Sequence, residues 1–390
     1  MQLIFLAHPE YLGNKSMIRF ARLLAEGMAR RGHQVETWTP KSKLAKLSTH
    51  PFIQKWLSYV DHYILFSGEL KRRVRRQPAD TLFVLTDQSL GLWVKPIASR
   101  AHVIHCHDFL ALKSALGEIP ENPINWSGRK YQTMIRKGFS RGKYFISVSL
   151  KTKEELDELV LQQPEISEVV YNGLHQKFAQ LDTRTARTSF GKEAGIDLTR
   201  GYILHVGGNA WYKNRLGVIM IYDAWRRMTA NPLPLLLVGA ELTTELQSRV
   251  DKSQYRPDIY CLTNINDDQI ILAYAGASLF LFPSLGEGFG WPIAEAMASG
   301  TIVITTGEAP MSEVAGDAAY LIPRQPLEAT ASERWAEKSA VIVEEVVTLS
   351  PQARSEAISR GIVNARRFET EGSLDRIEAI YKRVVRIPVK

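Results

Sequence analysis

Phe282-Pro-Ser-Leu-Gly-Glu-Gly-Phe-Gly-Trp-Pro-Ile-Ala-Glu-Ala-Met-Ala-Ser-Gly300 is the most informative stretch of the sequence. It predicts a strand that ends near Pro283, a loop with three glycines, and a helix that starts near Pro292, where proline suits the first turn. Ligands of parallel α/β sheets bind beyond the carboxyl ends of strands. Glycines admit a ligand close to the backbone there, and a helix start attracts anions. We therefore expect Glu287 and Glu295 to face a ligand at such an edge.

A second loop, Val206–Asn214, has the same setting between an expected strand and an expected helix. Lys213 at the helix start suits a phosphate, and Asn214 suits the helix cap. Each loop alone also fits an ordinary turn, with two solvated glutamates in one and a surface lysine in the other. The glycines do not spell G-x-G-x-x-G, so dinucleotide binding is not indicated. Two such loops together favour a phosphorylated ligand between them.

Short apolar runs alternate with helical periods along the whole chain, which predicts parallel sheets covered on both faces. The length of 390 residues suggests two domains. The alternation of expected strands and helices starts again after residue 200, so we place a linker in the polar segment 175–200. Closing helices are expected at about 332–349, 351–368 and 372–386. Strands are expected at 3–7, 34–38, 82–86, 103–106, 144–148, 169–171, 202–206, 235–238, 259–262, 279–282, 302–304 and 319–322.

Composition narrows the setting of the protein. The two cysteines, Cys106 and Cys261, lie in apolar runs, so we expect both to be buried and the compartment to be reducing. The apolar run at the start of the chain is too short for a signal peptide, and no basic residue precedes it. No run reaches the roughly 18 apolar residues of a membrane span. The sequence therefore predicts a cytoplasmic protein.

The net charge of +8 is concentrated in the first half of the chain. Residues 1–180 hold 26 Lys and Arg residues against 16 Asp and Glu residues, whereas the remainder holds 23 against 25. Lys71-Arg-Arg-Val-Arg-Arg76 follows a helical stretch whose apolar positions are Phe52, Ile53, Trp56, Tyr59, Tyr63 and Phe66. Such a segment suits an anionic membrane surface, and a packed helix with a solvated basic end is an equal alternative.

His105 and His107 lie on one side of an expected strand, and His107 ends it beside Asp108. The pair lacks a third ligand at metal-binding spacing. A strand-end histidine serves as a general base or a hydrogen-bond donor in some enzymes, and is more often a satisfied core group.

Taken in order, these segments resemble the retaining glycosyltransferases called group 1 or family 4. The stretch from Phe282 to Met297 matches the family signature P-S-x-x-E-G-F-G-x-P-x-x-E-A-M closely. Weaker matches occur in the family's order at Arg30–Val35, Ile104–Asp108, Ile146–Ser149, Tyr171–Gly173 and Leu236–Gly239.

The resemblance implies a GT-B fold, with two Rossmann-like domains facing across a cleft. Residues 1–185 would bind the acceptor, residues 195–370 would bind a sugar nucleotide, and the helix within 371–390 would return to the first domain. His107, Glu287 and Lys213 are the implied catalytic residues. The implied donor-binding residues are Gly13, Gly208, Asn209, Lys213, Leu262, Glu287, Gly288, Phe289, Gly290 and Glu295.

In this scheme Glu287 contacts the sugar hydroxyls, Glu295 holds the ribose hydroxyls, and Lys213 neutralises the diphosphate. The sequence departs from the family pattern in three places. Gly208 and Asn209 stand where an arginine is usual, Gly13 is the single glycine of its loop, and Trp291 replaces a common leucine.

The resemblance implies transfer of a hexose from a GDP- or UDP-sugar to a glycan or lipid-linked acceptor, with retention and without a cofactor or metal ion. The expected partners are the sugar nucleotide, the acceptor and an anionic membrane surface on which the protein is peripheral, but not nucleic acid. Two alternatives stay open. One is a non-catalytic membrane- or nucleic-acid-binding module, and the other is an epimerase or phosphorylase of the same two-domain plan.

Overall fold

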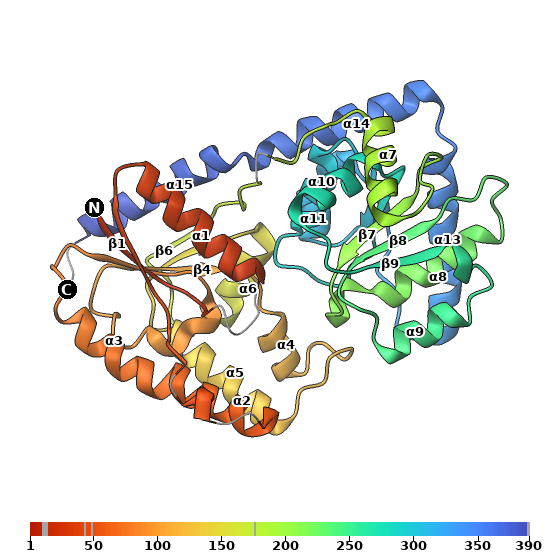
Figure 1. The fold of residues 1–390 in the computed structure, drawn as a ribbon. Coiled ribbons are helices and arrows are strands. Elements are labelled where there is room, and N and C mark those ends of the chain that lie inside the picture. Colours follow the sequence, from red (N-terminus) through yellow and green to blue (C-terminus); the bar gives the residue numbers. More distant parts are fainter. Residues whose placement is uncertain (10–14, 43, 48–49, 175–176, 388–390) are drawn as a thin grey trace. The chain divides into compact units, whose positions relative to one another are not determined.

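The computed structural model describes the chain except for residues 10–14, 43, 48–49, 175–176 and 388–390. It divides into two compact units. The first consists of Met1–Tyr171 with Glu371–Lys390, and the second of Asn172–Thr370. Each unit is a parallel sheet with helices on its faces (Figure 1).

In the first unit, the described residues form a six-stranded parallel sheet in the order β2-β1-β3-β4-β5-β6. The central strands β3, β4 and β5 are fully buried, as a sheet covered on both faces requires, and β3 is entirely apolar. The strands are β1 Gln2–Leu6, β2 Gln34–Trp38, β3 Leu82–Leu85, β4 His102–Cys106, β5 Tyr144–Ser147 and β6 Ile166–Val169. The helices are α1 Lys15–Arg30, α2 Pro51–Val60, α3 Phe66–Val74, α4 Leu110–Leu116, α5 Trp126–Phe139, α6 Leu150–Leu159 and α15 Thr370–Arg386, with a π-helical turn Asp61–Leu65 between α2 and α3.

In the second unit, the described residues form a parallel sheet in the order β12-β11-β10-β7-β8-β9. Its strands are β7 Ile203–Gly207, β8 Leu235–Gly239, β9 Ile259–Leu262, β10 Leu279–Phe282, β11 Val303–Thr306 and β12 Tyr320–Ile322. Its helices are α7 Thr183–Ala194, α8 Arg215–Arg226, α9 Thr244–Asp251, α10 Asp267–Gly276, α11 Trp291–Ala298, α12 Met311–Ala315, α13 Ala329–Val347 and α14 Pro351–Ala365.

Both sheets contain a point where the strand order reverses. In the first unit this point lies between β1 and β3, and in the second it lies between β7 and β10. Loops that leave neighbouring strands in opposite directions open a crevice at the carboxyl ends, which is where such sheets bind ligands. The loops after β7 and β10 are the two that the sequence singled out.

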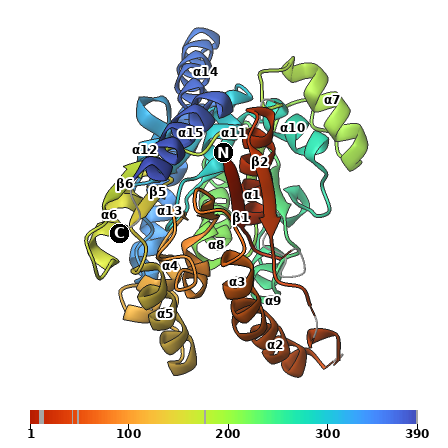
Figure 2. The ribbon, with the colours of Figure 1, turned by 90° about the vertical axis from the view of Figure 1, so that its left-hand side faces the viewer.

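Helix α15 packs against the first unit, beside α1 in both views (Figures 1 and 2). Gly27 permits the close approach, because a Cβ atom added there would lie 2.6 Å from Leu374 Cδ1. The Tyr381 hydroxyl meets His105 Nε2 at 2.7 Å, and both side chains are buried.

Three expectations need correction. The segment 175–200 is not a simple linker, because α7 lies within it, and the units divide at Tyr171 and Asn172 instead. Helix α7 is capped by Asp182 and anchored by Arg187, which donates to the Gly276 carbonyl of α10. Strand β6 begins three residues earlier than expected and ends at Val169. Cys261 is exposed, because it lies on the edge strand β9, whereas Cys106 is buried as expected.

Candidate functional site

Lys213 and Glu287 form an ion pair at the carboxyl edge of β7 and β10. Lys213 Nζ lies 2.8 Å and 3.0 Å from the two carboxylate oxygens of Glu287. The side chains are 16% and 8% exposed, so water screens the pair weakly. Ser284 Oγ lies 2.8 Å from Glu287 Oε1 and fixes the carboxylate from the strand side. The structure thus joins the two loops through the residues that the sequence predicted.

Local backbone geometry positions this pair. Asn214 has a positive φ of 51°, caps α8 by accepting from the Gly217 N–H, and donates to the Pro283 carbonyl at 2.9 Å. It therefore ties the loop after β7 to the loop after β10. Gly290, at the start of α11, has a φ of 105°, which favours glycine, and provides no side-chain cap. Pro292 has no N–H and the Ile293 N–H donates to the Gly290 carbonyl at 3.0 Å, so what the start of α11 offers an anion is the positive end of the helix dipole.

Glu295 lies in the second turn of α11 and is 6% exposed. Its carboxylate accepts a hydrogen bond from the Tyr274 hydroxyl of α10 at 3.2 Å. The two glutamates of the signature thus have different partners, Lys213 for Glu287 and Tyr274 for Glu295.

The other predicted donor residues have clear places. Gly208 and Asn209 lie in the loop after β7, and Asn209 is exposed and donates to the Glu241 carbonyl. Leu262 ends the edge strand β9 and is half-buried. Gly288 is half-buried in the loop before α11. The Phe289 ring packs on Phe368 at 5.2 Å, so its side chain belongs to the core. Gly13 lies outside the described residues.

Two further residues of this edge were not foreseen. His205 of β7 is buried, and its Nδ1 lies 3.0 Å from the Leu281 carbonyl, which only accepts, so Nδ1 carries the proton and donates. Burial, together with the charges of Arg215 and Lys213, outweighs the hydrogen bond to Leu281 and lowers the pKa of His205 to about 3. Arg215, the first residue of α8, is also buried. Its burial is invisible in a sequence, because residues at helix starts are usually solvated.

The first unit has a polar cluster at its own reversal point. His8 follows β1, Asp87 follows β3, and their side chains meet at 2.9 Å. Burial raises the pKa of Asp87, but the hydrogen bond and charge of His8, together with His107 and the Ser89 N–H, outweigh it and leave the pKa lowered. The sequence analysis missed this pair because its members lie 79 residues apart.

His107 follows β4 and is buried. Its Nε2 lies 2.8 Å from the Thr86 carbonyl, which only accepts, so Nε2 carries the proton and Nδ1 is the acceptor. Burial lowers the pKa of His107, although Asp87 and the Thr86 carbonyl oppose this. The ring is therefore neutral near pH 7. His105 and His107 both contact the Phe20 ring and lie on one face, as expected.

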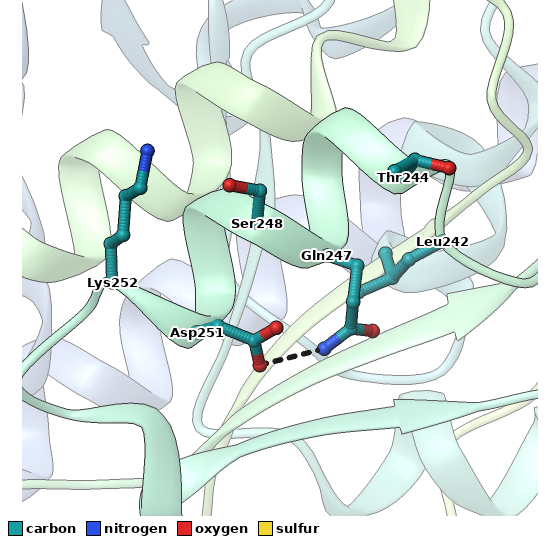
Figure 3. A pocket seen from close by; sticks show the side chains of 6 residues that line it. All are labelled: Leu242, Thr244, Gln247, Ser248, Asp251 and Lys252. Atoms are coloured by element: carbon teal, nitrogen blue, oxygen red, sulfur yellow. Dashed lines mark hydrogen bonds between the residues drawn. The ribbon is translucent and has the colours of Figure 1, made fainter.

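Other features of the structure lie away from these edges. An open hollow on α9 is lined by Leu242, Thr244, Gln247, Ser248, Asp251 and Lys252 (Figure 3). Gln247 donates to Asp251 across it at 2.9 Å. Among the described residues, no three His, Cys, Asp or Glu side chains come together as a metal site. In the same part of the chain, every helix is too short or too polar to cross a membrane.

Comparison with known proteins gives two family matches. Residues 200–335 match the model of glycosyl transferases group 1, and residues 17–177 match that of glycosyltransferase family 4. The chain is 29% identical over 185 residues to O-antigen chain mannosyltransferase B of Escherichia coli. That match covers 47% of this chain and 46% of the relative, so it spans about half the length of each.

Solved structures share the fold. HepE (Alr3699) of Anabaena, in complex with UDP and glucose, has a TM-score of 0.70 at 14% identity, over 97% of this chain and 98% of that one. WaaG, a glycosyltransferase involved in lipopolysaccharide biosynthesis, has a TM-score of 0.70 at 17% identity, over 97% and 99%. The two Rossmann-like units therefore constitute a GT-B fold. Together with the two family matches, this shows that the chain is a glycosyltransferase of the group 1 / family 4 type.

Proposed function

We propose that this glycosyltransferase transfers a hexose from a GDP- or UDP-sugar to a glycan or lipid-linked acceptor, with retention of the anomeric configuration. The observation that carries the proposal is the buried Lys213–Glu287 pair between the loops after β7 and β10. A diphosphate bound between Lys213 and the start of α11 would meet a cation and the positive end of a helix dipole together. Glu287 would then turn to the hydroxyls of the donor sugar.

In the proposed reaction, the bond between the sugar C1 and the diphosphate oxygen breaks, and a bond from C1 to the acceptor oxygen forms on the same face. The proton of the acceptor hydroxyl passes to the departing diphosphate. Lys213 and the α11 N-terminus stabilise the negative charge that develops, in place of a metal ion. His107 would accept a hydrogen bond from a sugar hydroxyl at Nδ1, since Nε2 is committed to Thr86.

The names of similar proteins support the choice of substrates. One relative is an O-antigen chain mannosyltransferase, and one structural neighbour was solved with UDP and glucose. WaaG acts in lipopolysaccharide biosynthesis. We therefore propose mannose as the first hexose to test, and polysaccharide or lipid glycan assembly as the process.

We also propose that the first unit docks on an anionic membrane. Along α2, the π-turn and α3, Ile53, Ile64 and Leu65 are exposed apolar side chains, and the basic end after them is solvated. Phe66 is instead buried against Trp93, so it packs in the core. The side chains of Phe52, Trp56, Tyr59 and Tyr63 lie outside what the structure describes.

Helix α5 supports the same proposal from an independent element. Trp126 is 74% exposed, Met134 is 48% exposed, and Lys130 lies over the Trp126 ring at 5.0 Å. The sequence contains no acidic residue between Glu121 and Glu154. Helices α2 and α5 lie at the same end of the first unit in both views (Figures 1 and 2). An exposed tryptophan beside lysines is the composition of an interfacial helix.

Turnover of a donor panel tests the transfer. Purified protein is incubated with GDP-mannose, UDP-glucose, UDP-N-acetylglucosamine and dTDP-glucose, with and without glycan acceptors, and release of the nucleoside diphosphate is measured. We expect release from one GDP- or UDP-sugar, and product NMR should show the donor's anomeric configuration. Lys213→Met should lower kcat/KM by about 100- to 1,000-fold, whereas Lys252→Met, in the hollow on α9, should not. If the protein neither releases a nucleoside diphosphate from any of these donors nor binds any of them, the proposal is rejected.

A further inference from the structure

Arg215 is a buried cation whose hydrogen-bond partners are all neutral. The residue is 3% exposed. Its Nη1 donates to Asn209 Oδ1 at 2.6 Å and to the Ala240 carbonyl at 2.8 Å. Among the described residues, its Nε and Nη2 have no hydrogen-bond partner, although both are buried. The guanidinium therefore holds two buried nitrogens, with three N–H groups between them, that lack a hydrogen-bond partner in the described part of the chain.

Such a charge is costly in a protein interior unless an anion meets it. Arg226, at the other end of α8, shows the usual solution. It lies 2.5 Å from Asp258, and its bonds to Tyr222 and Asp258 outweigh burial and raise its pKa. Burial instead lowers the pKa of Arg215, opposed only by Cys261. Arg215 thus lacks the carboxylate that Arg226 has.

The position of Arg215 indicates which anion would meet it. Its two partners follow β7 and β8, so the guanidinium lies at the carboxyl edge of the sheet. A Cβ atom added at Gly207, the last residue of β7, would lie 3.1 Å from His205 Nε2 and 3.5 Å from Lys213 Cδ, so these two side chains lie at the same edge as the partners of Arg215. Glu287 already compensates Lys213. Arg215, by contrast, has no carboxylate partner among the residues that the structure describes, so its charge still requires an anion.

We propose that Arg215 is the second cation of the diphosphate site and binds a phosphate of the nucleoside diphosphate through Nε and Nη2. The inference rests on the proposed function. It accounts for Gly208 and Asn209, which occupy the place of a usual arginine, because the charge comes from the start of α8 instead. Asn209 bridges Arg215 Nη1 and the Glu241 carbonyl, to which it donates at 2.6 Å. This exposed bridge must open for the phosphate to reach the guanidinium.

The ratio of the affinities for a nucleoside diphosphate and its monophosphate distinguishes phosphate binding by Arg215 from a purely structural role of this residue. Titration calorimetry compares GDP with GMP, and UDP with UMP, for the wild type, Arg215→Met and Arg215→Lys. We expect Arg215→Met to weaken diphosphate binding by about 10- to 100-fold, as for loss of charge-assisted hydrogen bonds. Monophosphate binding should fall less, so the diphosphate-to-monophosphate affinity ratio drops. Arg215→Lys should restore part of that ratio, because it keeps the charge without the planar fork.

Arg354→Met is the matched control. Arg354 donates to the carbonyls of Ser278 and Val346, at the amino end of β10. Its loss should lower the melting temperature and leave the affinity ratio unchanged. If Arg215→Met does not fold, the diphosphate-to-monophosphate affinity ratio of Arg215→Lys, compared with that of the wild type, tests the inference. Unchanged ratios in the folded Arg215 variants overturn this inference while the proposed function stands. A wild type that binds none of the nucleotides overturns both.

Discussion

Glu287 and Glu295 stand eight residues apart in the signature, yet each has its own partner. Glu287 leaves the loop after β10 and pairs with Lys213, whereas Glu295 projects from the second turn of α11 toward Tyr274. When a phosphate binds Lys213, the Glu287 carboxylate can exchange its bonds to that lysine for hydrogen bonds from sugar hydroxyls, as we propose. A carboxylate held by a tyrosine is suited to stay in place and accept from two ribose hydroxyls.

Removing the Glu295 carboxylate should therefore abolish donor binding while the fold survives. We expect Glu295→Ala to weaken nucleotide affinity beyond detection, and Glu295→Gln to weaken it about 10-fold, because the amide still accepts from Tyr274. Glu344→Gln is the matched control, since Glu344 accepts from Trp225 Nε1 at 2.6 Å in the same unit. Calorimetric titration measures the affinity, and circular dichroism the fold. Wild-type affinity in Glu295→Ala would remove Glu295 from the site.

Residues that lie in loops next to expected strands were predictable from the sequence. Lys213 and Glu287 belong to that class, because strand, loop and helix follow one another within one stretch of chain. The His8–Asp87 pair was not predictable, since strand order brings its members together. Arg215 was not predictable either, because only the packing of the loops after β7 and β8 shows that it is buried.

At the scale of elements, α15 is held to the first unit by an apolar face and a row of ion pairs. Arg31 lies 2.6 Å from Glu371 and 2.9 Å from Asp375, and His33 lies 2.9 Å from Glu378. The hydrogen bond from Lys382 lowers the pKa of Glu378, burial opposes this, and His33 adds to the lowering. Protonation of Glu378 should therefore loosen the helix.

Glu378→Gln should reveal this by its pH dependence. A carboxylate whose pKa is lowered on folding adds stability above its unfolded pKa, and that stability is lost as pH falls through the folded pKa. We expect the variant to be less stable by up to about 1 kcal/mol at pH 7, and the difference to vanish as the solution becomes more acidic than the usual pKa of 4.5. Urea unfolding of both proteins across pH 3–7 measures it, with the exposed Glu26→Gln as control. A difference that is constant with pH would contradict this assignment.

The bounds of strands were predictable where the sequence has continuous apolar runs. They were least predictable near the boundary between the two units. Strands β9 and β10 have the expected bounds, because their runs end in polar or proline residues. Helix α7 was missed because its sequence is polar with only a short apolar face, of which Ala186 and Phe190 are the buried part. Its contacts with α10 stabilise it, and periodicity does not record such contacts.

At the scale of the whole molecule, the uneven charge predicts membrane association through the first unit. A sedimentation assay with vesicles of phosphatidylglycerol and phosphatidylcholine measures binding at 0.1 M salt. We expect Arg72→Glu/Arg75→Glu/Arg76→Glu to weaken binding by about 100-fold or more, because each basic residue contributes about 1 kcal/mol near such a surface. Arg334→Glu/Lys338→Glu/Arg360→Glu, an equal charge change on exposed residues of the second unit, should have little effect. Equal losses in both variants would show that only net charge matters.

We propose that the second unit binds an activated sugar's diphosphate between the loops after β7 and β10. A crystal structure of the chain soaked with its donor, or with the corresponding nucleoside diphosphate, tests this most directly. We expect phosphate oxygens within hydrogen-bond distance of Lys213 Nζ and next to the N-terminus of α11, with the ribose hydroxyls on Glu295. A nucleotide bound in the hollow on α9, or at the reversal point of the first unit, would contradict it.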